Sequence, residues 1–179
     1  MSDLPGLVGQ RLRHARQGRG WSLAALASDA GIGKGSLSEI ENGVRNPTLS
    51  TLYALANALG VPLSAVLAEE VGAEVSSPGI TAQLLHVEHD ESGTLEVFRM
   101  RFEPGSRHES GGHARGVTEH LYVTDGSVRA GRRRRETTIA AGQSATWVSD
   151  VWHSYRALEA RPASAVLVIR SPRQELTVA

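Results

Sequence analysis

The segment from Trp21 to Gly43 carries side chains that suit hydrogen bonding to the edges of DNA bases. Its sequence predicts two short helices joined by a tight glycine turn, with small polar side chains along the outer face of the second helix. A bare helix with short polar groups can enter the major groove, where each base pair presents its own pattern of donors and acceptors. The segment therefore predicts sequence-specific DNA binding.

A second group of residues has the side chains to bind a metal ion or a polar ligand. His113 and Glu119 have the same parity along the chain as Leu121 and Val123, so on a regular strand all four side chains share one face. Apolar residues such as Leu121 and Val123 are what the inner face of a β-structure contains. We therefore expect His113 and Glu119 to point into a shared pocket.

The elements that must position the first group are helices. From Leu7 to about Ala68, apolar residues recur at helical spacing. Ser22 and Thr48 are placed to cap the second and fourth of these helices. The pattern predicts an all-α domain of five helices that share one core, and we assign residues 1–69 to it.

The second group lies in a half of the chain with β periodicity. Residues 70–79 lose the helical pattern and gain Gly, Ser and Pro, so we expect a linker there. Beyond it, apolar and polar residues alternate in short segments that are separated by turns containing Gly or Pro. This spacing predicts an all-β antiparallel sandwich or barrel over residues 80–179. The four arginines at 132–135 are expected in a solvated hairpin turn.

Composition limits the function classes further. The chain has 179 residues, 40% of them hydrophobic, and its formal net charge of zero argues against indiscriminate coating of nucleic acid. Between Leu7 and Pro62, six basic residues stand against three acidic ones, which gives this part a modest positive charge. The absence of cysteine excludes disulfides and thiolate-bound zinc. No long apolar run and no signal-peptide pattern occur, so we expect a cytoplasmic protein with no membrane partner.

Residues 7–68 resemble the lambda-repressor-like helix-turn-helix of the xenobiotic-response-element (XRE) family of transcriptional regulators. The matches stay in register over the whole stretch, which is more specific than a lone turn glycine. They are Arg11, Arg16, Leu26, Ala27, Gly31, Ile32, Leu37, Ser38, Glu41, Gly43, Pro47, Leu52, Leu55, Ala56, Leu59 and Val61. The resemblance implies that the second helix lies across the DNA backbone and the third helix lies in the major groove.

The same resemblance implies which residues face the DNA. Leu37 and Ile40 must face the core, which turns the remaining side chains of the third helix outward. Ser and Lys can bond base edges, Glu can accept from a cytosine amine, and Gly permits close approach. The residues expected close to the bases are Lys34, Gly35, Ser36, Ser38 and Glu39, and the expected phosphate contacts are Ser22, Asn42 and Arg45. Glu41 is expected to be structural and to hold an arginine of the first helix, because phosphate would repel it.

The second half resembles the cupin domains, double-stranded β-helix or jelly-roll barrels that are often appended to these regulators. The resemblance rests on Pro104 and Gly105, on His113, Glu119 and Gly126 at the spacing of the first cupin motif, and on Gly142 and His153 of the second. In a cupin, three histidines and a glutamate usually hold a divalent metal. The resemblance implies a metal site, for Zn, Ni or Fe, at His113, Glu119 and His153. Two histidines and one carboxylate also equal the facial triad of non-haem iron enzymes.

Two positions depart from the cupin pattern. Arg115 occupies the place of the second histidine, and Ala157 that of an expected asparagine. A guanidinium would repel a divalent ion and could pair with Glu119 in its place. We therefore favour a metal-free or weakly metal-binding pocket for a small anionic or polar effector, with a purely structural ion pair as the alternative. Its expected lining is His113, Arg115, Glu119, His153 and Tyr155, and Trp147 and Trp152 are expected in the β core.

These observations favour a transcriptional regulator over an enzyme. The expected protein is a homodimeric repressor that binds a double-stranded operator and whose cupin domain senses a small-molecule effector and supports dimerisation. The alternatives are a non-haem iron cupin oxygenase or epoxidase with an attached helix-turn-helix, and a cupin that only dimerises.

Overall fold

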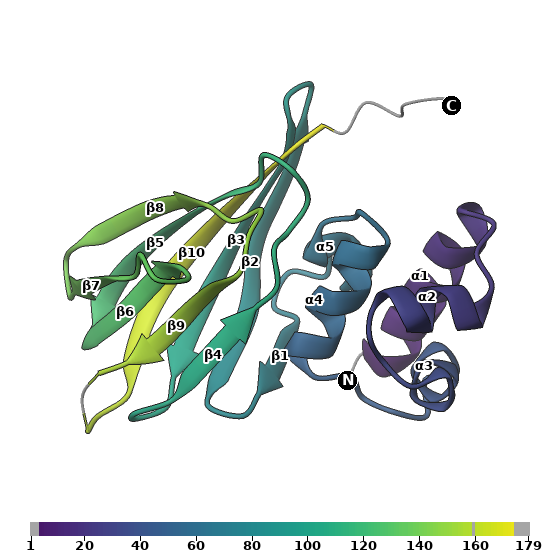
Figure 1. Ribbon diagram of the computed structural model, residues 1–179, viewed down its shortest axis with the longest axis horizontal. Helices are drawn as coiled ribbons and strands as arrows, with labels where there is room; N and C mark the ends of the chain where they lie inside the picture. The colour runs from purple at the N-terminus through teal and green to yellow at the C-terminus, as the bar shows by residue number, and fades with distance from the viewer. Residues whose placement is uncertain (1–3, 159, 174–179) are drawn as a thin grey trace.

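The computed structural model describes residues 4–158 and 160–173, and it separates into a helical part and a β part (Figure 1). Residues 1–3 of the expected first domain, and residues 159 and 174–179 of the second, lie outside the described residues. The described chain begins with the helices α1 (Leu4–Gly18), α2 (Leu23–Asp29), α3 (Lys34–Glu41), α4 (Leu49–Ala58) and α5 (Leu63–Val66). None of the described helices is both long and apolar enough to cross a membrane.

The helix starts follow the capping residues that the sequence predicts. The Ser22 hydroxyl accepts a hydrogen bond from the Ala25 amide at 3.1 Å, and the Thr48 hydroxyl accepts one from Thr51 at 3.2 Å. Gly33 precedes α3 and supplies no side-chain cap. Side-chain caps therefore fix the first turns of α2 and α4, whereas α3 depends on its packing.

The helices share a leucine-rich core. Fully buried side chains come from every helix of this domain, among them Leu12, Leu26, Leu37, Leu49, Leu52, Leu55, Leu59 and Leu63. Helix α1 comes especially close to α3, because a Cβ atom added at Gly9 would meet the Ile40 carbonyl oxygen inside van der Waals contact. This close approach sets the position of α3.

Ten strands make up the β part within the described residues. They are β1 (Glu74–Ser77), β2 (Ile80–Asp90), β3 (Gly93–Phe102), β4 (Arg107–Ser110), β5 (Thr118–Asp125), β6 (Ser127–Arg132), β7 (Thr137–Ala140), β8 (Ser144–Val148), β9 (His153–Ala157) and β10 (Ala163–Pro172). One sheet has the order β1-β2-β3-β10-β5-β8 and the other β4-β9-β6-β7, and all pairs are antiparallel. The two sheets lie face to face, with α4 and α5 beside the larger one (Figure 1).

The alternation of β5 directs its functional residue inward. Glu119, Leu121 and Val123 are buried, whereas His120 and Tyr122 are exposed. His113 is not part of this strand, which begins at Thr118, so the parity argument placed it on the wrong element. It lies in the loop after β4, where its backbone N–H donates to the Ser149 carbonyl at 2.8 Å.

Residues 70–79, expected as a linker, contain a strand of the larger sheet. Strand β1 pairs with β2 in the register Val75 to Ala82, and Val75 and Ser77 are buried. The Ser77 hydroxyl also accepts from the Ser50 amide of α4 at 3.0 Å. The small and polar residues of this stretch thus join the two domains by packing and hydrogen bonding.

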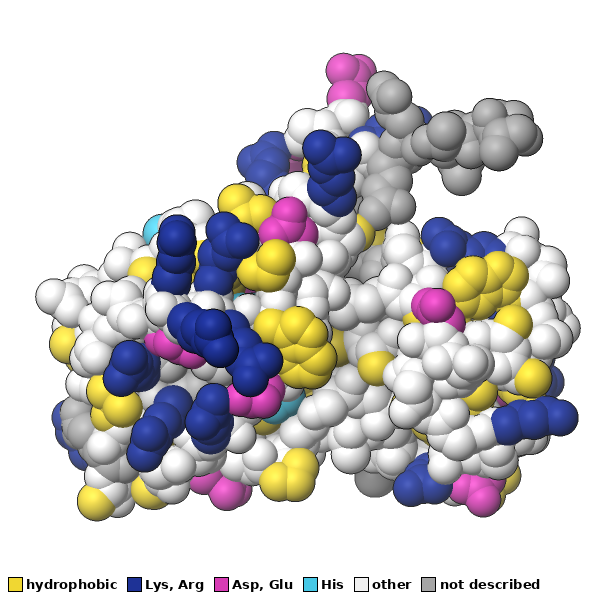
Figure 2. Space-filling view, viewed as in Figure 1, with side chains coloured by type: hydrophobic (Ala, Val, Ile, Leu, Met, Phe, Trp, Pro, Cys, Tyr) yellow, Lys and Arg dark blue, Asp and Glu magenta, His cyan; other side chains and the backbone are white. Residues whose placement is uncertain are grey.

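The outer face of the smaller sheet is basic. Arg107, Arg156 and Arg129 stand opposite one another on β4, β9 and β6, and all three are exposed. Of the arginines at 132–135, Arg132 ends β6, and the other three lie exposed in the hairpin between β6 and β7, as predicted. Figure 2 shows basic side chains gathered over this region, and all of them are arginines because the one lysine of the chain lies in α3. A net charge of zero therefore hides a strongly basic face. Trp152, expected in the core, is 55% exposed.

The close approach of α1 to α3 generates a stability prediction. Replacing Gly9 with alanine should lower the free energy of unfolding by about 1–3 kcal/mol, because the methyl group must displace backbone atoms of α3. Gly18→Ala at the end of the same helix is the matched control, since its Cβ would meet no atom within 4 Å. Urea denaturation followed by circular dichroism measures both variants, and equal stabilities would refute the packing argument.

Candidate functional site

Helix α3 presents a polar face to solvent and an apolar face to the core. Leu37 and Ile40 are 0% and 2% exposed. On the other side, Lys34, Gly35 and Glu39 are exposed, and Ser36 and Ser38 are half-buried. The five residues expected near the bases therefore lie on the accessible side of the helix.

The expected phosphate-contacting residues lie at the edges of this face. An Arg45 guanidinium nitrogen donates to the Ser36 hydroxyl at 3.0 Å and to Glu39 at 3.3 Å. The Asn42 amide donates to the Ser38 carbonyl at 2.8 Å, and its oxygen accepts from Arg13 at 2.6 Å. Exposed hydrogen bonds of this kind exchange readily with a ligand or water. Ser22 is exposed at the start of α2, although its hydroxyl also caps that helix.

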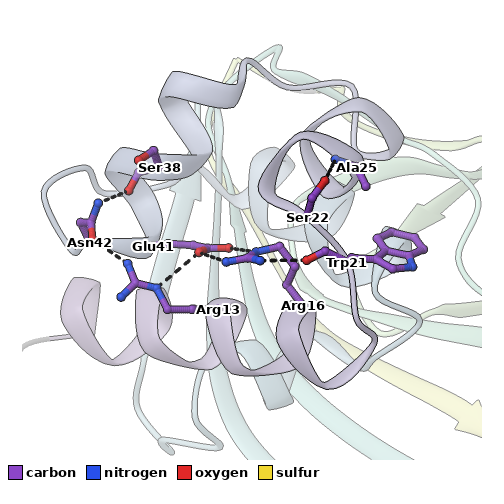
Figure 3. Close-up of polar contacts among 8 residues, drawn as sticks. All are labelled: Arg13, Arg16, Trp21, Ser22, Ala25, Ser38, Glu41 and Asn42. Atoms are coloured by element: carbon purple, nitrogen blue, oxygen red, sulfur yellow. Dashed lines mark hydrogen bonds and ion pairs between the residues drawn. The ribbon is translucent and has the colours of Figure 1, made fainter.

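Glu41 fixes α3 to α1, as the sequence predicts (Figure 3). The Arg16 guanidinium donates to both carboxylate oxygens of Glu41, at 2.7 and 2.8 Å, and to the Trp21 carbonyl at 2.9 Å. The hydrogen bond to Glu41 is the main cause that raises the pKa of Arg16. The two side chains are only 12% and 2% exposed. One guanidinium thus connects α1, the turn before α2, and α3.

The second group gathers around Glu119, inside the β domain. Its Oε1 atom lies 2.8 Å from His113 Nε2 and 3.2 Å from His153 Nε2. The Tyr155 hydroxyl donates to Glu119 Oε2. The two histidines and the glutamate each offer a ligand atom, and these atoms lie within 4.8 Å of one another. We call His113, Glu119 and His153 the His/Glu cluster.

The cluster holds a buried negative charge. Burial alone would raise the pKa of Glu119, but hydrogen bonds and positive charge from the two histidines outweigh it and hold the pKa well below its usual range. Burial would lower the pKa of His153, but the adjacent Glu119 carboxylate more than compensates, so that pKa is raised. Burial and the Glu119 charge raise the pKa of Tyr155 well above its usual value. Tyr155 therefore remains a hydrogen-bond donor at neutral pH.

The donor set of the His/Glu cluster fits a divalent cation. Within the described residues, His153 Nε2 is a buried nitrogen that makes no well-aligned hydrogen bond, although Glu119 is close enough for ion pairing. The other ring nitrogen of His153 donates to the Val151 carbonyl, at 2.9 Å. That bond leaves the Nε2 lone pair directed into the cluster, as a metal ligand requires.

Arg115 does not belong to this group, which corrects the sequence-based expectation. Its side chain is exposed in the loop before β5, because that loop turns the residue outward and His113 inward. The guanidinium therefore neither pairs with Glu119 in the barrel nor opposes a cation there. The four other residues expected in the pocket, His113, Glu119, His153 and Tyr155, do come together.

The cavities around the His/Glu cluster differ greatly in volume. A cavity beside His153 and Tyr155, where α4 meets the interior of the β domain, has a volume of only about 10 Å³. A cavity of about 290 Å³ lies between α4, α5 and the larger sheet, and His113 and Glu96 reach its wall. Its apolar lining includes Ala56, Val61, Leu63, Val117 and Ile169. A further groove of about 510 Å³ lies between the helices and β4, next to Trp152.

Three site residues of the domain junction escaped the sequence analysis. Asn57 of α4 lies with its Oδ1 atom 3.0 Å from His113 Nδ1, and the Tyr53 ring packs at 5.2 Å from the His113 ring. Glu96 of β3 is buried and accepts from the Ser64 amide of α5 at 2.6 Å. Burial is the main cause that raises the pKa of Glu96. No local motif signals these contacts, because each one joins residues far apart in the sequence.

The pair that holds α3 generates a prediction. Arg16→Met should destabilise the helical domain by about 3 kcal/mol, because it leaves the buried Glu41 carboxylate without its main partner. Arg13→Met is the control, since Arg13 is 42% exposed and its ion pair with Glu41 contributes below about 1 kcal/mol. Urea denaturation compares the two, and an equal loss in both variants would contradict the assigned roles.

Comparison with known proteins agrees with this geometry in both halves. Residues 12–66 match the family model of a helix-turn-helix, and residues 98–169 match that of a cupin domain. The chain is 31% identical over 160 residues to the HTH-type transcriptional regulator SutR of Escherichia coli (strain K12), covering 87% of this chain and 90% of SutR. It is also 43% identical over 63 residues to the immunity repressor protein of Bacillus phage phi105, covering 35% of this chain and 44% of the repressor.

A solved structure shares the arrangement of the whole chain. The crystal structure of an HTH_3 family transcriptional regulator from Vibrio cholerae has a TM-score of 0.82 at 27% sequence identity, and covers 96% of this chain and 100% of that chain. The likeness therefore spans the helices, the sheets and the junction between them. The chain belongs to the family of XRE-type helix-turn-helix transcriptional regulators that carry a cupin domain.

Proposed function

We propose that this DNA-binding regulator is a homodimeric repressor that reads its operator with the exposed face of α3. The observation that carries the proposal is the polar face of α3, held outward by the buried Arg16–Glu41 pair. Lys34, Gly35, Ser36, Ser38 and Glu39 would lie against the bases, with Ser22, Asn42 and Arg45 on the phosphates. Two-fold symmetry would place two such helices about 34 Å apart on a palindromic site.

We also propose that the cupin domain, as a jelly-roll barrel, senses a small molecule at the domain junction. The cavity of about 290 Å³ is near the lower end of the range for small-molecule sites, whereas the interior cavity of about 10 Å³ has no room for one. The aliphatic walls suit a compact molecule with an apolar body. The molecule would also carry polar groups, because the lining further includes Asn57, His89, Asp90, Glu96, His113 and Arg173. Such a ligand would touch α4, α5 and the β domain together, and could thereby change operator affinity.

The His/Glu cluster would hold a divalent cation, with Zn, Ni and Fe as the candidates. The exposure of Arg115 supports this role, because it removes the positive charge that would oppose the ion. The ion would supply a fixed positive charge beside His113. Glu119 would neutralise part of that charge, and Tyr155 would orient the carboxylate through its hydrogen bond. The likeness to regulators over the whole chain favours this sensing role over turnover by an iron oxygenase.

The assignment of the reading face generates a prediction about specificity. Ser38→Ala and Lys34→Ala should each reduce discrimination between the selected operator and a single-base variant by about 1–3 kcal/mol, because each removes a base-directed group. Arg45→Ala is the comparison variant. It should weaken binding to all duplexes and lower the slope of log affinity against log salt by about one unit.

Fluorescence anisotropy with the full chain measures both effects across a salt series. Circular dichroism confirms that each variant keeps its helices. If Ser38→Ala and Lys34→Ala both retain the operator preference of the unmodified chain, the assigned reading face is wrong.

The cation proposal predicts a thermal shift. Zn²⁺ or Ni²⁺ at about a hundredfold excess over its dissociation constant should stabilise the chelator-treated chain by about 2.7 kcal/mol, measured as a rise in Tm. His153→Ala should abolish the rise. His120→Ala should retain it, because His120 is exposed on β5 and contacts Thr146 instead of the cluster. An equal rise in both variants would place the ion elsewhere.

A further inference from the structure

The side chain of His113, one member of the His/Glu cluster, is contacted by the DNA-binding domain. His113 Nε2 faces Glu119 Oε1 at 2.8 Å, and the opposite ring nitrogen, Nδ1, faces Asn57 Oδ1 at 3.0 Å. Asn57 belongs to α4 and lies 56 residues before His113 in the sequence. The ring of His113 therefore spans the junction between the two domains.

The chemistry of this contact places a hydrogen on Nδ1 of His113. A side-chain amide oxygen only accepts hydrogen bonds, so the hydrogen of this bond must reside on Nδ1. The other nitrogen, Nε2, faces the Glu119 carboxylate, which also only accepts, so Nε2 donates to it in the ion-free cluster. Nε2 would give up this hydrogen to become a metal ligand. Partners of this kind, on the far side of a metal-binding histidine, orient the ring and raise its basicity.

A second residue of α4 restricts the same ring. Tyr53 lies four residues before Asn57, so both side chains project from one face of the helix. The Tyr53 ring lies 5.2 Å from the His113 ring, at an interplanar angle of 39°. The hydrogen bond and the ring contact together determine where His113 Nε2 points.

The other face of α4 belongs to the helical core. Leu52 and Leu55 are buried there, and α4 contacts α2 of the helix-turn-helix. Leu49 and Ala56 lie on the same side as Tyr53 and line cavities toward the β domain. A shift of α4 relative to the sheet would therefore move Asn57 and rotate the ring of His113.

We propose that Asn57 is a positioning residue of the metal site, which makes cation binding depend on the placement of the DNA-binding domain. This inference rests on the proposed cation site and assigns it a residue outside the cupin domain. Coupling between cation binding and the position of α4 is reciprocal. An ion that favours the observed position of α4 therefore also favours the observed position of the helices packed against α4. The cluster and the reading helix are thus connected through a single helix.

The test measures Co²⁺ binding to the full chain, using cobalt absorption and a competing chelator. Asn57→Leu keeps the approximate size of the side chain and removes the acceptor, so it should weaken Co²⁺ binding about 10- to 100-fold. Asn57→Asp retains an acceptor oxygen and should restore most of the affinity. Ser50→Ala is the matched control, because it removes another hydrogen bond between α4 and the sheet without touching His113.

Each outcome separates positioning from simple stabilisation. The proposal expects the Co²⁺ affinity of Asn57→Leu to fall well below that of Ser50→Ala, even where the metal-free Tm values of the two variants agree. Unchanged Co²⁺ affinity in Asn57→Leu would overturn the positioning role and leave the cation site standing. If the unmodified chain binds no Co²⁺, the cation site and the role of Asn57 both fail, while operator binding by the same sample decides the DNA-binding proposal separately.

Discussion

The buried Glu41 carboxylate is the constraint on which the DNA-binding surface depends. A charge in the core must be paired and hydrogen-bonded, and the Arg16 guanidinium satisfies it with two bonds at 2.7 and 2.8 Å. Removing Arg16 would leave the buried Glu41 carboxylate with only its 3.4 Å contact to the partly exposed Arg13, so the Arg16–Glu41 pair fixes α1 relative to α3. Gly9 permits the required close approach, and the polar face of α3, which we propose reads DNA, is left exposed.

Two further buried carboxylates connect distant parts of the chain. Glu96 of β3 accepts from the backbone of α5, and Glu119 of β5 joins the loop after β4 to β9. Each of the three carboxylates contacts partners outside its own helix or strand. Each one therefore fixes the relative position of two elements, which apolar packing alone does not specify. In this sense the reading helix, the domain junction and the His/Glu cluster are built on the same physical principle.

Local patterns predicted the parts of the structure that depend on local physics. Helical spacing gave the helical domain, Ser22 and Thr48 were identified as caps, and the structural role of Glu41 followed from the repulsion between an acid and phosphate. Within residues 70–79, predicted as a linker, β1 forms because its small residues gain their burial from β2 and α4, which composition does not reveal. Parity assigned His113 to the wrong element, and the cupin spacing put Arg115 in the pocket, because neither pattern showed that both residues lie in a loop before β5. Asn57 was missed because its partner is supplied by the other domain.

The central claim is that α3 reads base pairs while the cupin domain responds to small ligands. Selection of duplexes from a random library by the full chain, at moderate salt, tests the reading function directly. The account predicts enrichment of one motif with two-fold symmetry, whose half-sites are separated by about one helical turn, roughly 34 Å. Recovery of sequences no different from the starting library would contradict it.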